Sequence, residues 1–281
     1  CLALGRPFID EIKAPLRTLF WACEDDQDEL WRRQLAICRY FGVGPGTVEQ
    51  WGKALGTTEQ KSTSPQAIVE YRRNENIDGP IYVGKDTHAL SGPAELTALE
   101  VLAGNDVPAL IDLGERYTPT PAVSVAIINH NKGKAETDPS RADGLVITPS
   151  HNPPTDGGFK YNPPHGGPAD SDATNWIAAR ANEIILGGLR EVKRAAPAPT
   201  KFHYRDNYVS QLADVLNMDA IRDSGVSIGA DPMGGASVDY WGAIGERFAL
   251  NLTVVNPNVD FQFGFMNLDW DGKIRMDCSS P

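Results

Sequence analysis

The chain has 281 residues, enough for roughly two domains of about 100–200 residues each. A composition of 41% hydrophobic and 22% charged residues is typical of a globular protein and excludes wholesale disorder. The net charge of −11 argues against nucleic acid and anionic membranes as partners, because like charges repel.

The first 62 residues show no clear period and do not connect to the pattern that follows. Residues 29–41 permit an amphipathic helix, and a glycine-rich stretch comes after them. We leave residues 1–62 unassigned, with a frameshifted or misjoined start and a separate interaction module as open alternatives. The chain begins at Cys1 and lacks the basic start and long apolar core of a signal peptide.

The cysteines and the hydropathy pattern indicate a cytoplasmic protein. The four cysteines are sparse and form no C-x-x-C pair, so we expect reduced thiols rather than a disulfide scaffold or a metal site. No apolar run approaches the roughly 20 residues that a membrane-spanning helix needs. The cysteines are Cys1, Cys23, Cys38 and Cys278.

From about residue 66 the pattern alternates between strand and helix. Short apolar runs predict buried strands at 80–86, 107–114 and 144–148. Helical spacing predicts a helix at 92–106, with Leu96, Leu99 and Leu102 on one face. Two more helices are predicted, one from Pro121 with Thr120 as its cap, and one to about Gly187 with Ser171 or Asp172 as its cap. This order of elements predicts an α/β layer fold.

A stretch rich in proline and alanine, residues 193–201, predicts a linker. The alternation then restarts, with helices at 203–217 and 237–249 and strands at 225–231 and 252–256. We therefore expect a first α/β domain at 63–196 and a partial second α/β domain at 197–281. The second sheet is unfinished at Pro281, since only two strands have been formed.

The segment from Asp143 to Asp170, DGLVITPSHNPPTDGGFKYNPPHGGPAD, carries the chemistry. A buried strand leads into a loop whose prolines have fixed φ angles and restrict the residues before them. Ser150 therefore lies on a stiff loop at the carboxyl end of a strand, where α/β sheets usually place their sites. Glycines nearby allow close approach of an anion, and His151 and Lys160 supply cationic or proton-transferring groups.

This segment resembles the active-site loop of the α-D-phosphohexomutases, whose hallmark is T-P-S-H-N-P, and in its longer form the bacterial phosphoglucomutase branch. Further similarity lies in YVGKDTHALS (82–91), YTPTPAVS (117–124) and D-P-M-G-G (231–235). The resemblance runs from about residue 66 to the C-terminus. It implies a phosphohexomutase domain I followed by an incomplete domain II.

The resemblance implies an isomerase of glucose metabolism that interconverts glucose 1-phosphate and glucose 6-phosphate. Ser150 would carry a phosphate, donate it to the hexose phosphate substrate and recover it from a bound bisphosphate. Mg²⁺ would contact the phosphate on Ser150, with its remaining ligands beyond residue 281, and glucose 1,6-bisphosphate would be the activator. Lys160 matches the family lysine that moves protons on the sugar hydroxyl, and His151 would orient the phosphate or assist proton transfer.

Each of these residues also has an ordinary interpretation. A serine in a proline-rich loop is usually a solvated turn residue, Lys160 a surface charge, and His151 a donor to the loop backbone. Lys85, Asp86 and His88 end a predicted strand, where they either face the site or form a turn, and we assign them no role. A serine hydrolase is rejected, because adjacent side chains diverge and no G-x-S-x-G elbow is present.

Two family motifs are absent from the sequence. We find neither a phosphate-contacting F-G-T-S-G-x-R-G loop before residue 66 nor a D-x-D-x-D-R metal loop. Ser150 alone should hold Mg²⁺ weakly, so we expect this chain to be a fragment with little or no mutase activity. The alternative is a non-catalytic sugar-phosphate binding or regulatory protein. The length of the match to the phosphoglucomutase branch favours a glucose phosphate over a mannose phosphate as the substrate. The oligomeric state is open.

Overall fold

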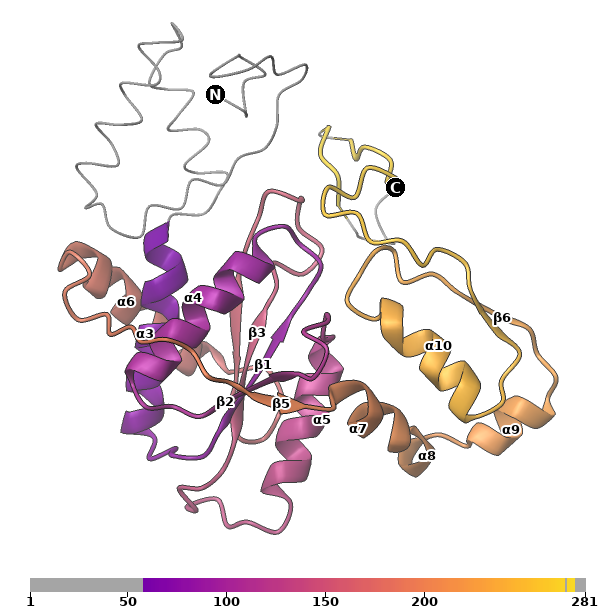
Figure 1. The fold of residues 1–281 in the computed structure, drawn as a ribbon, viewed down its shortest axis with the longest axis horizontal. Coiled ribbons are helices and arrows are strands. Elements are labelled where there is room, and N and C mark those ends of the chain that lie inside the picture. The colour runs from indigo at the N-terminus through magenta and orange to yellow at the C-terminus, as the bar shows by residue number, and fades with distance from the viewer. Residues whose placement is uncertain (1–57, 271, 276–281) are drawn as a thin grey trace, which may run out of the picture. The chain divides into compact units, whose positions relative to one another are not determined.

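A computed structural model describes residues 58–270 and 272–275 (Figure 1). The chain divides into two compact units, residues 1–54 and 55–281, and all described elements belong to the second. The helix considered at 29–41 and all four cysteines lie outside the described residues, as do the residues from 276 to the chain end.

A five-stranded sheet forms the centre of the first part of the described unit. The strands lie in the order β4-β3-β1-β2-β5, with four of them parallel and β4 antiparallel to β3. The parallel strands β1, β2 and β3 follow the apolar runs of the sequence, so the predicted α/β fold is confirmed. The strands are β1 (Ile81–Lys85), β2 (Ala109–Asp112), β3 (Asp143–Ile147), β4 (Phe159–Asn162) and β5 (Thr200–Phe202).

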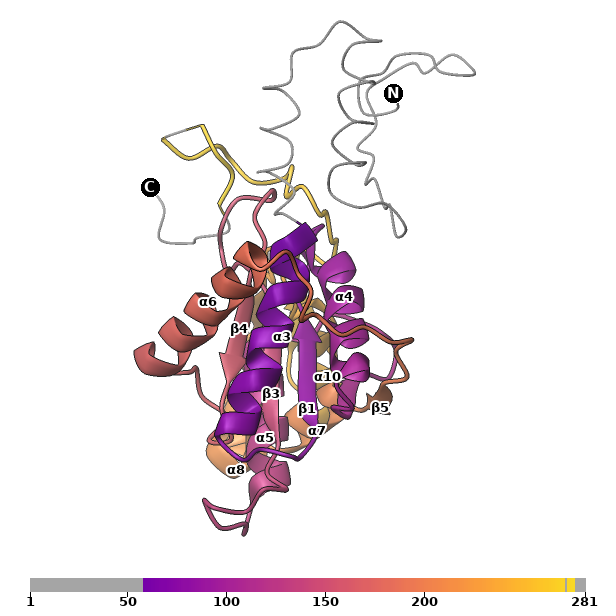
Figure 2. The same cartoon turned by 90° about the vertical axis from the view of Figure 1, so that its left-hand side faces the viewer.

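Helices cover both faces of this sheet. Successive strand residues point to opposite sides, and apolar residues on both sides need to be covered. One face carries Ile81, Val83 and Leu145, which pack with α3, α4 and α6 (Figure 2). The other face carries Tyr82 and Val146, which pack with α5 and the first residue of α7. The helices are α3 (Thr58–Asn74), α4 (Ser91–Gly104), α5 (Thr120–Asn131), α6 (Ser171–Leu186) and α7 (Tyr204–Ser210).

The helix ends differ from the sequence predictions. Thr120 is the first helical residue of α5 and its side chain caps nothing, since the N-cap is the extended Pro119. The cap of α6 is Asp170, one residue before the predicted caps, and its carboxylate accepts a hydrogen bond from the backbone N–H of Ala173 at 2.9 Å. In α4 the sheet buries Leu99 and Leu102 but leaves Leu96 45% exposed. Local pattern thus located the helices but not their capping residues.

The expected linker ends inside the first sheet, because residues 200–202 form β5 and pair in parallel with β2. The helix predicted at 203–217 is broken at Gln211 into α7 and a short α8. A second, two-stranded parallel sheet then pairs β6 with β7. None of the described helices is long and apolar enough to cross a membrane. The later elements are α8 (Leu212–Val215), α9 (Met218–Asp223), β6 (Ile228–Ala230), α10 (Val238–Arg247) and β7 (Leu252–Val254).

A buried ion pair fixes α3 to the first residue of β3. Arg72 donates from Nε to Asp143 Oδ2 at 2.7 Å and also to the carbonyl oxygen of Gly79. Tyr161 donates its hydroxyl to the same carboxylate oxygen at 2.7 Å. Burial raises the pKa of Asp143, and the charge of Arg72 and the Tyr161 hydroxyl oppose that rise. The carboxylate is therefore held in the core by its two donors.

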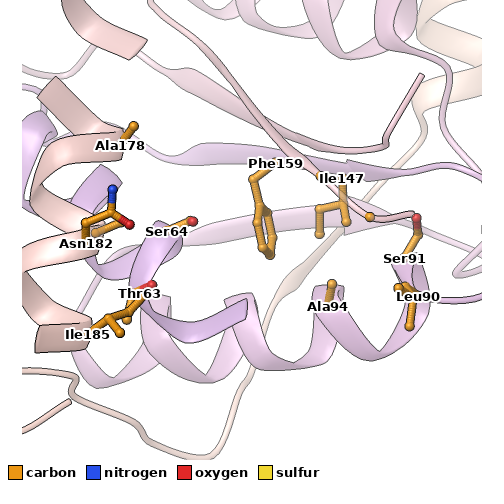
Figure 3. A pocket seen from close by; sticks show the side chains of 13 residues that line it. Thr63, Ser64, Leu90, Ser91, Ala94, Ile147, Phe159, Ala178, Asn182 and Ile185 are labelled. Atoms are coloured by element: carbon orange, nitrogen blue, oxygen red, sulfur yellow. The ribbon is translucent and has the colours of Figure 1, made fainter. Parts of the chain in front are cut away.

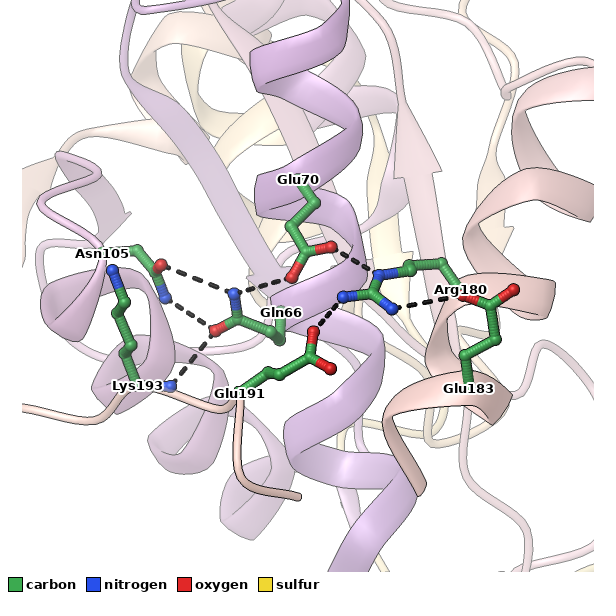
Figure 4. A network of polar contacts seen from close by, with 7 residues as sticks. All are labelled: Gln66, Glu70, Asn105, Arg180, Glu183, Glu191 and Lys193. Atoms are coloured by element: carbon green, nitrogen blue, oxygen red, sulfur yellow. Dashed lines mark hydrogen bonds and ion pairs between the residues drawn. The ribbon is translucent and has the colours of Figure 1, made fainter. Parts of the chain in front are cut away.

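A polar network joins α3 to α6 and to the segment that follows α6 (Figure 4). Arg180 donates to Glu70 at 2.6 Å and to Glu183 and Glu191. Gln66 accepts hydrogen bonds from Asn105 Nδ2 at 2.8 Å and from the backbone N–H of residue 193 at 3.2 Å. These contacts hold α3, α4 and α6 together on one face of the sheet.

Candidate active site

The loop that carries Ser150, residues 148–158, is a closed connection between β3 and β4; we call it the serine loop. The backbone N–H of Thr148 donates to the carbonyl oxygen of Gly158 at 3.0 Å and closes its base. A Cβ at Gly158 would lie 2.8 Å from that Thr148 carbonyl oxygen, so only glycine fits. Residues 159–162, which the sequence analysis assigned to no element, pair antiparallel with β3.

Ser150 has a strained backbone near the start of this loop. Its φ of 67° lies in the left-handed region, which costs a non-glycine residue roughly 1–2 kcal/mol. The backbone N–H of Ser150 donates to Thr148 Oγ1 at 2.9 Å, which helps to hold that conformation. The side chain is exposed, so the hydroxyl is open to a reacting group.

Asp86, immediately after β1, anchors the start of the serine loop. Its backbone N–H donates to the carbonyl oxygen of Ile147 at 3.0 Å, and its Oδ2 accepts the Thr148 hydroxyl at 2.6 Å. The same carboxylate also accepts hydrogen bonds from the backbone and ring of His88 and from the hydroxyl of Ser91. Burial alone would raise the pKa of Asp86, but these donors and the charge of His88 lower it overall.

His88 links that carboxylate to the far side of the serine loop. Its Nδ1 lies 2.7 Å from Asp86 Oδ2 and its Nε2 lies 3.0 Å from the carbonyl oxygen of Asn152. Both partners only accept hydrogen bonds, so both ring nitrogens donate and the ring is an imidazolium. Burial lowers the pKa of His88, but the Asp86 carboxylate, the Asn152 carbonyl and the charge of Asp156 outweigh it and raise the pKa.

The other two predicted site residues lie near Ser150 in the chain but are not bonded to it. His151 is exposed on the serine loop. Lys160 is exposed on β4 and pairs with Val146, one pair inward from the end of the strands, so it lies on the α5 side of the sheet. In the part of the chain that the structure describes, no hydrogen bond joins the side chains of Ser150, His151 and Lys160.

The residues that hold the serine loop were left unassigned by the sequence analysis. Asp86 and His88 ended a predicted strand and gave no sign of a partner. Their position at the end of a predicted strand could have indicated a role in the site. Parallel strands put their carboxyl ends at one edge of a sheet, so the residues after β1 and β3 meet. Thr148 was predicted as the last residue of a strand and as a residue restricted by the proline that follows it, without a role in the site.

The described residues do not fit a magnesium site on their own. Among them there is no group of three or more His, Cys, Asp or Glu side chains able to hold a metal ion. Asp86, the carboxylate that anchors the start of the serine loop, already accepts four hydrogen bonds. Mg²⁺ requires near-octahedral oxygen ligands, and Ser150 would supply one of them.

A cavity of about 260 Å³ lies behind the base of the serine loop (Figure 3). Gly157 and Gly158 form part of its wall, and residues of α3, α4, α6, β3 and β4 form most of the rest. Its lining is largely apolar, with polar groups at Thr63, Ser64, Ser91 and Asn182. Ser150, His151 and Lys160 are not among the lining residues, so the cavity is separate from the predicted site residues.

Comparison with known proteins agrees with this arrangement. Residues 46–186 match the α/β/α domain I of the phosphoglucomutase/phosphomannomutase family, starting ahead of the boundary expected at 63. A phosphoglucomutase of Komagataeibacter xylinus is 49% identical over 249 residues, which cover 85% of this chain and 44% of that protein. Phosphoglucomutase 1 of Drosophila melanogaster is 33% identical over 150 residues, which cover 52% of this chain and 25% of that protein.

The fold agrees as well. The crystal structure of a phosphoglucomutase from Paramecium superposes with a TM-score of 0.59 at 18% identity, covering 74% of this chain and 42% of that one. This chain spans less than half the length of these relatives. The mostly parallel sheet carries the serine loop at the carboxyl end of β3, and the match to domain I covers half of the chain. This protein therefore belongs to the phosphoglucomutase/phosphomannomutase family.

Proposed function

We propose that this chain is the serine-bearing part of a phosphoglucomutase that interconverts glucose 1-phosphate and glucose 6-phosphate through a phosphoserine at Ser150. The observation that carries the proposal is the strained backbone of Ser150, whose side chain is exposed. Thr148 holds that backbone and is itself hydrogen-bonded to Asp86 of the Asp86–His88 pair. Strain of this kind persists where the surroundings over-determine it, and it gathers at functional sites. The relative at 49% identity, itself a phosphoglucomutase, supports the glucose assignment.

The reaction moves one phosphoryl group in each direction. The bond between Ser150 Oγ and phosphorus breaks as a bond forms from a free hydroxyl oxygen of the sugar monophosphate, which gives a sugar bisphosphate. The proton of that hydroxyl leaves to a base, for which we propose Lys160, with His151 orienting the phosphate. The base passes this proton to Ser150 Oγ, which becomes a free hydroxyl. When the other phosphate returns to Ser150, the serine proton moves back through the base to the sugar oxygen that phosphorus leaves.

Mg²⁺ is expected to stabilise charge on the phosphate in the family, but the described donor set does not hold it, so we assign it no step. Glucose 1,6-bisphosphate is proposed as the activator, because it is the bisphosphate that can phosphorylate a free serine. A half-reaction is therefore the sharpest test, since it needs one transfer to Ser150 and no complete turnover.

The test incubates the purified chain with glucose 1,6-bisphosphate and maps phosphopeptides by mass spectrometry. We expect phosphate on the peptide that contains Ser150, its loss in Ser150→Ala, and its retention in Ser171→Ala, the exposed serine at which α6 begins. Glucose 1-phosphate and mannose 1-phosphate are then compared as acceptors, and faster release to glucose 1-phosphate is expected. Phosphate on another residue, or none on Ser150, would contradict the proposal.

A further inference from the structure

The segment that follows β7 contacts the support of the serine loop through one buried ring. Phe263 is 1% exposed, and its ring centroid lies 5.0 Å from that of His88, with the two planes tilted by 51°. Phe261, two residues earlier, is 48% exposed. The contact with His88 therefore singles out one phenylalanine of the run DFQFGF.

The backbone around Phe263 is shaped to present that ring. The Asp260 carboxylate accepts hydrogen bonds from the backbone N–H groups of Gln262 and Gly264, each at 2.9 Å. The backbone N–H of Phe263 donates to the Asp260 carbonyl oxygen at 2.9 Å, and its φ of 50° lies in the left-handed region. A buried aromatic residue held in this conformation indicates that its surroundings over-determine its position.

A glycine of the D-P-M-G-G run makes room for the aromatic cluster. Gly234 has a φ of 67°, and a Cβ there would lie 2.9 Å from the ring of Phe265 and 3.5 Å from that of Phe263. Phe265 in turn contacts Phe263 edge-on, with centroids 6.3 Å apart. The loop after β6 and the segment 260–265 therefore converge on the ring that covers His88.

We propose that Phe263 is a positioning residue for the serine loop, acting through His88. The edge of the imidazole makes two hydrogen bonds, to Asp86 and Asn152, and Phe263 covers the ring. Removing that cover lets water compete for both hydrogen bonds and lets the imidazole turn away from Asn152. Segment 260–265 is thereby coupled to the loop that presents Ser150. The expected effect on Ser150 phosphorylation rests on the proposed function, whereas the structural coupling does not.

Hydrogen exchange measured by mass spectrometry tests the coupling directly. In Phe263→Ala we expect the peptide 148–158 to exchange about tenfold faster, whereas Phe261→Ala leaves its exchange unchanged. Peptides from β1 and β3 serve as the folding control and should keep their protection. Unchanged exchange of 148–158 in Phe263→Ala, with its own segment loosened, would overturn the proposal.

Two more variants separate positioning from simple destabilisation. Asp260→Ala removes the acceptors that shape the turn and should also speed exchange of 148–158, while Phe263→Leu restores an apolar cover and should recover most of the protection. The rate of Ser150 phosphorylation by glucose 1,6-bisphosphate should fall in Phe263→Ala and recover in Phe263→Leu. A normal rate of Ser150 phosphorylation in Phe263→Ala, with faster exchange of 148–158, would overturn the positioning role. Absence of phosphorylation in the unaltered chain would count against the proposed function, and the exchange results would still decide the coupling.

Discussion

The Nε2 atom of His88 lies 3.0 Å from the carbonyl oxygen of Asn152, a residue 64 positions later in the chain. Its Nδ1 lies 2.7 Å from the carboxylate of Asp86. One side chain thus fastens the end of β1 to the loop that carries Ser150. Both bonds need a donating nitrogen, so the link depends on the second ring proton, and the protonation state of His88 controls how firmly the loop is held.

The serine loop is expected to loosen as pH rises through the pKa of His88. That pKa is raised from 6.5, so the stabilising contribution of His88 is fully present below pH 6.5 and is lost above it as the folded pKa is passed. The pKa of Asp86 is lowered from 3.8, so its contribution is present above pH 3.8 and is lost on acidification through its folded pKa. The Asp86–His88 pair is therefore at full strength between these two values.

Hydrogen exchange of the peptide 148–158, corrected for the intrinsic pH dependence, measures this effect. Protection should fall on the alkaline side in the unaltered chain. His88→Gln keeps a donor but has no titrating ring, so its protection should not vary with pH in this range. An identical alkaline loss in both proteins would show that a group other than His88 is responsible.

Thr148→Val should weaken the start of the serine loop without changing the volume of the side chain. The variant loses the hydroxyl that donates to Asp86 and accepts from the backbone N–H of Ser150. We expect a loss of about 1–2 kcal/mol in the free energy of unfolding, together with slower phosphorylation of Ser150. Urea titration measures the loss in the free energy of unfolding. Thr155→Val, an exposed threonine of the same loop, is the matched control and should stay within about 0.5 kcal/mol.

Replacing Ser150 separates backbone strain from chemistry. Both Ser150→Gly and Ser150→Ala remove the hydroxyl, so neither should be phosphorylated. Glycine adopts a φ of 67° without strain and alanine does not, so Ser150→Gly should be the more stable of the two by about 0.5–1 kcal/mol despite its greater freedom when unfolded. Thermal unfolding compares them, and equal stability would show that the left-handed conformation of this residue is not kept in solution.

Arg72→Met should be strongly destabilising, because it leaves Asp143 in the core without its ionic partner. The expected loss in the free energy of unfolding is about 3–5 kcal/mol at neutral pH. It should shrink on acidification, since a carboxyl whose pKa is already raised then becomes protonated. Arg73→Met, next in the chain and exposed, should cost less than about 1 kcal/mol. Similar losses for the two variants in urea titrations would refute this account.

Much of the fold could be predicted from the sequence because its signals act over a few residues. Apolar runs located β1, β2 and β3, and helical spacing together with cap and proline signals located α4, α5 and α6 to within a few positions. The prolines and glycines around Ser150 predicted a stiff loop after a strand, and the structure has one there. The motif also indicated the family to which the chain belongs. The catalytic roles of Ser150, His151 and Lys160 stay predictions.

Only the tertiary structure decided which distant residues meet. β4 and β5 are short edge strands that the local pattern did not predict, and the expected linker at 193–201 ends inside β5. Asp86 and His88 reach their distant partners, Thr148 and Asn152, only because β1 and β3 become neighbours. A hydrogen bond depends on positions fixed within tenths of an ångström, and the packing of whole helices and strands sets those positions. The sequence by itself therefore determined where the reactive loop lies, and the fold determined what holds it.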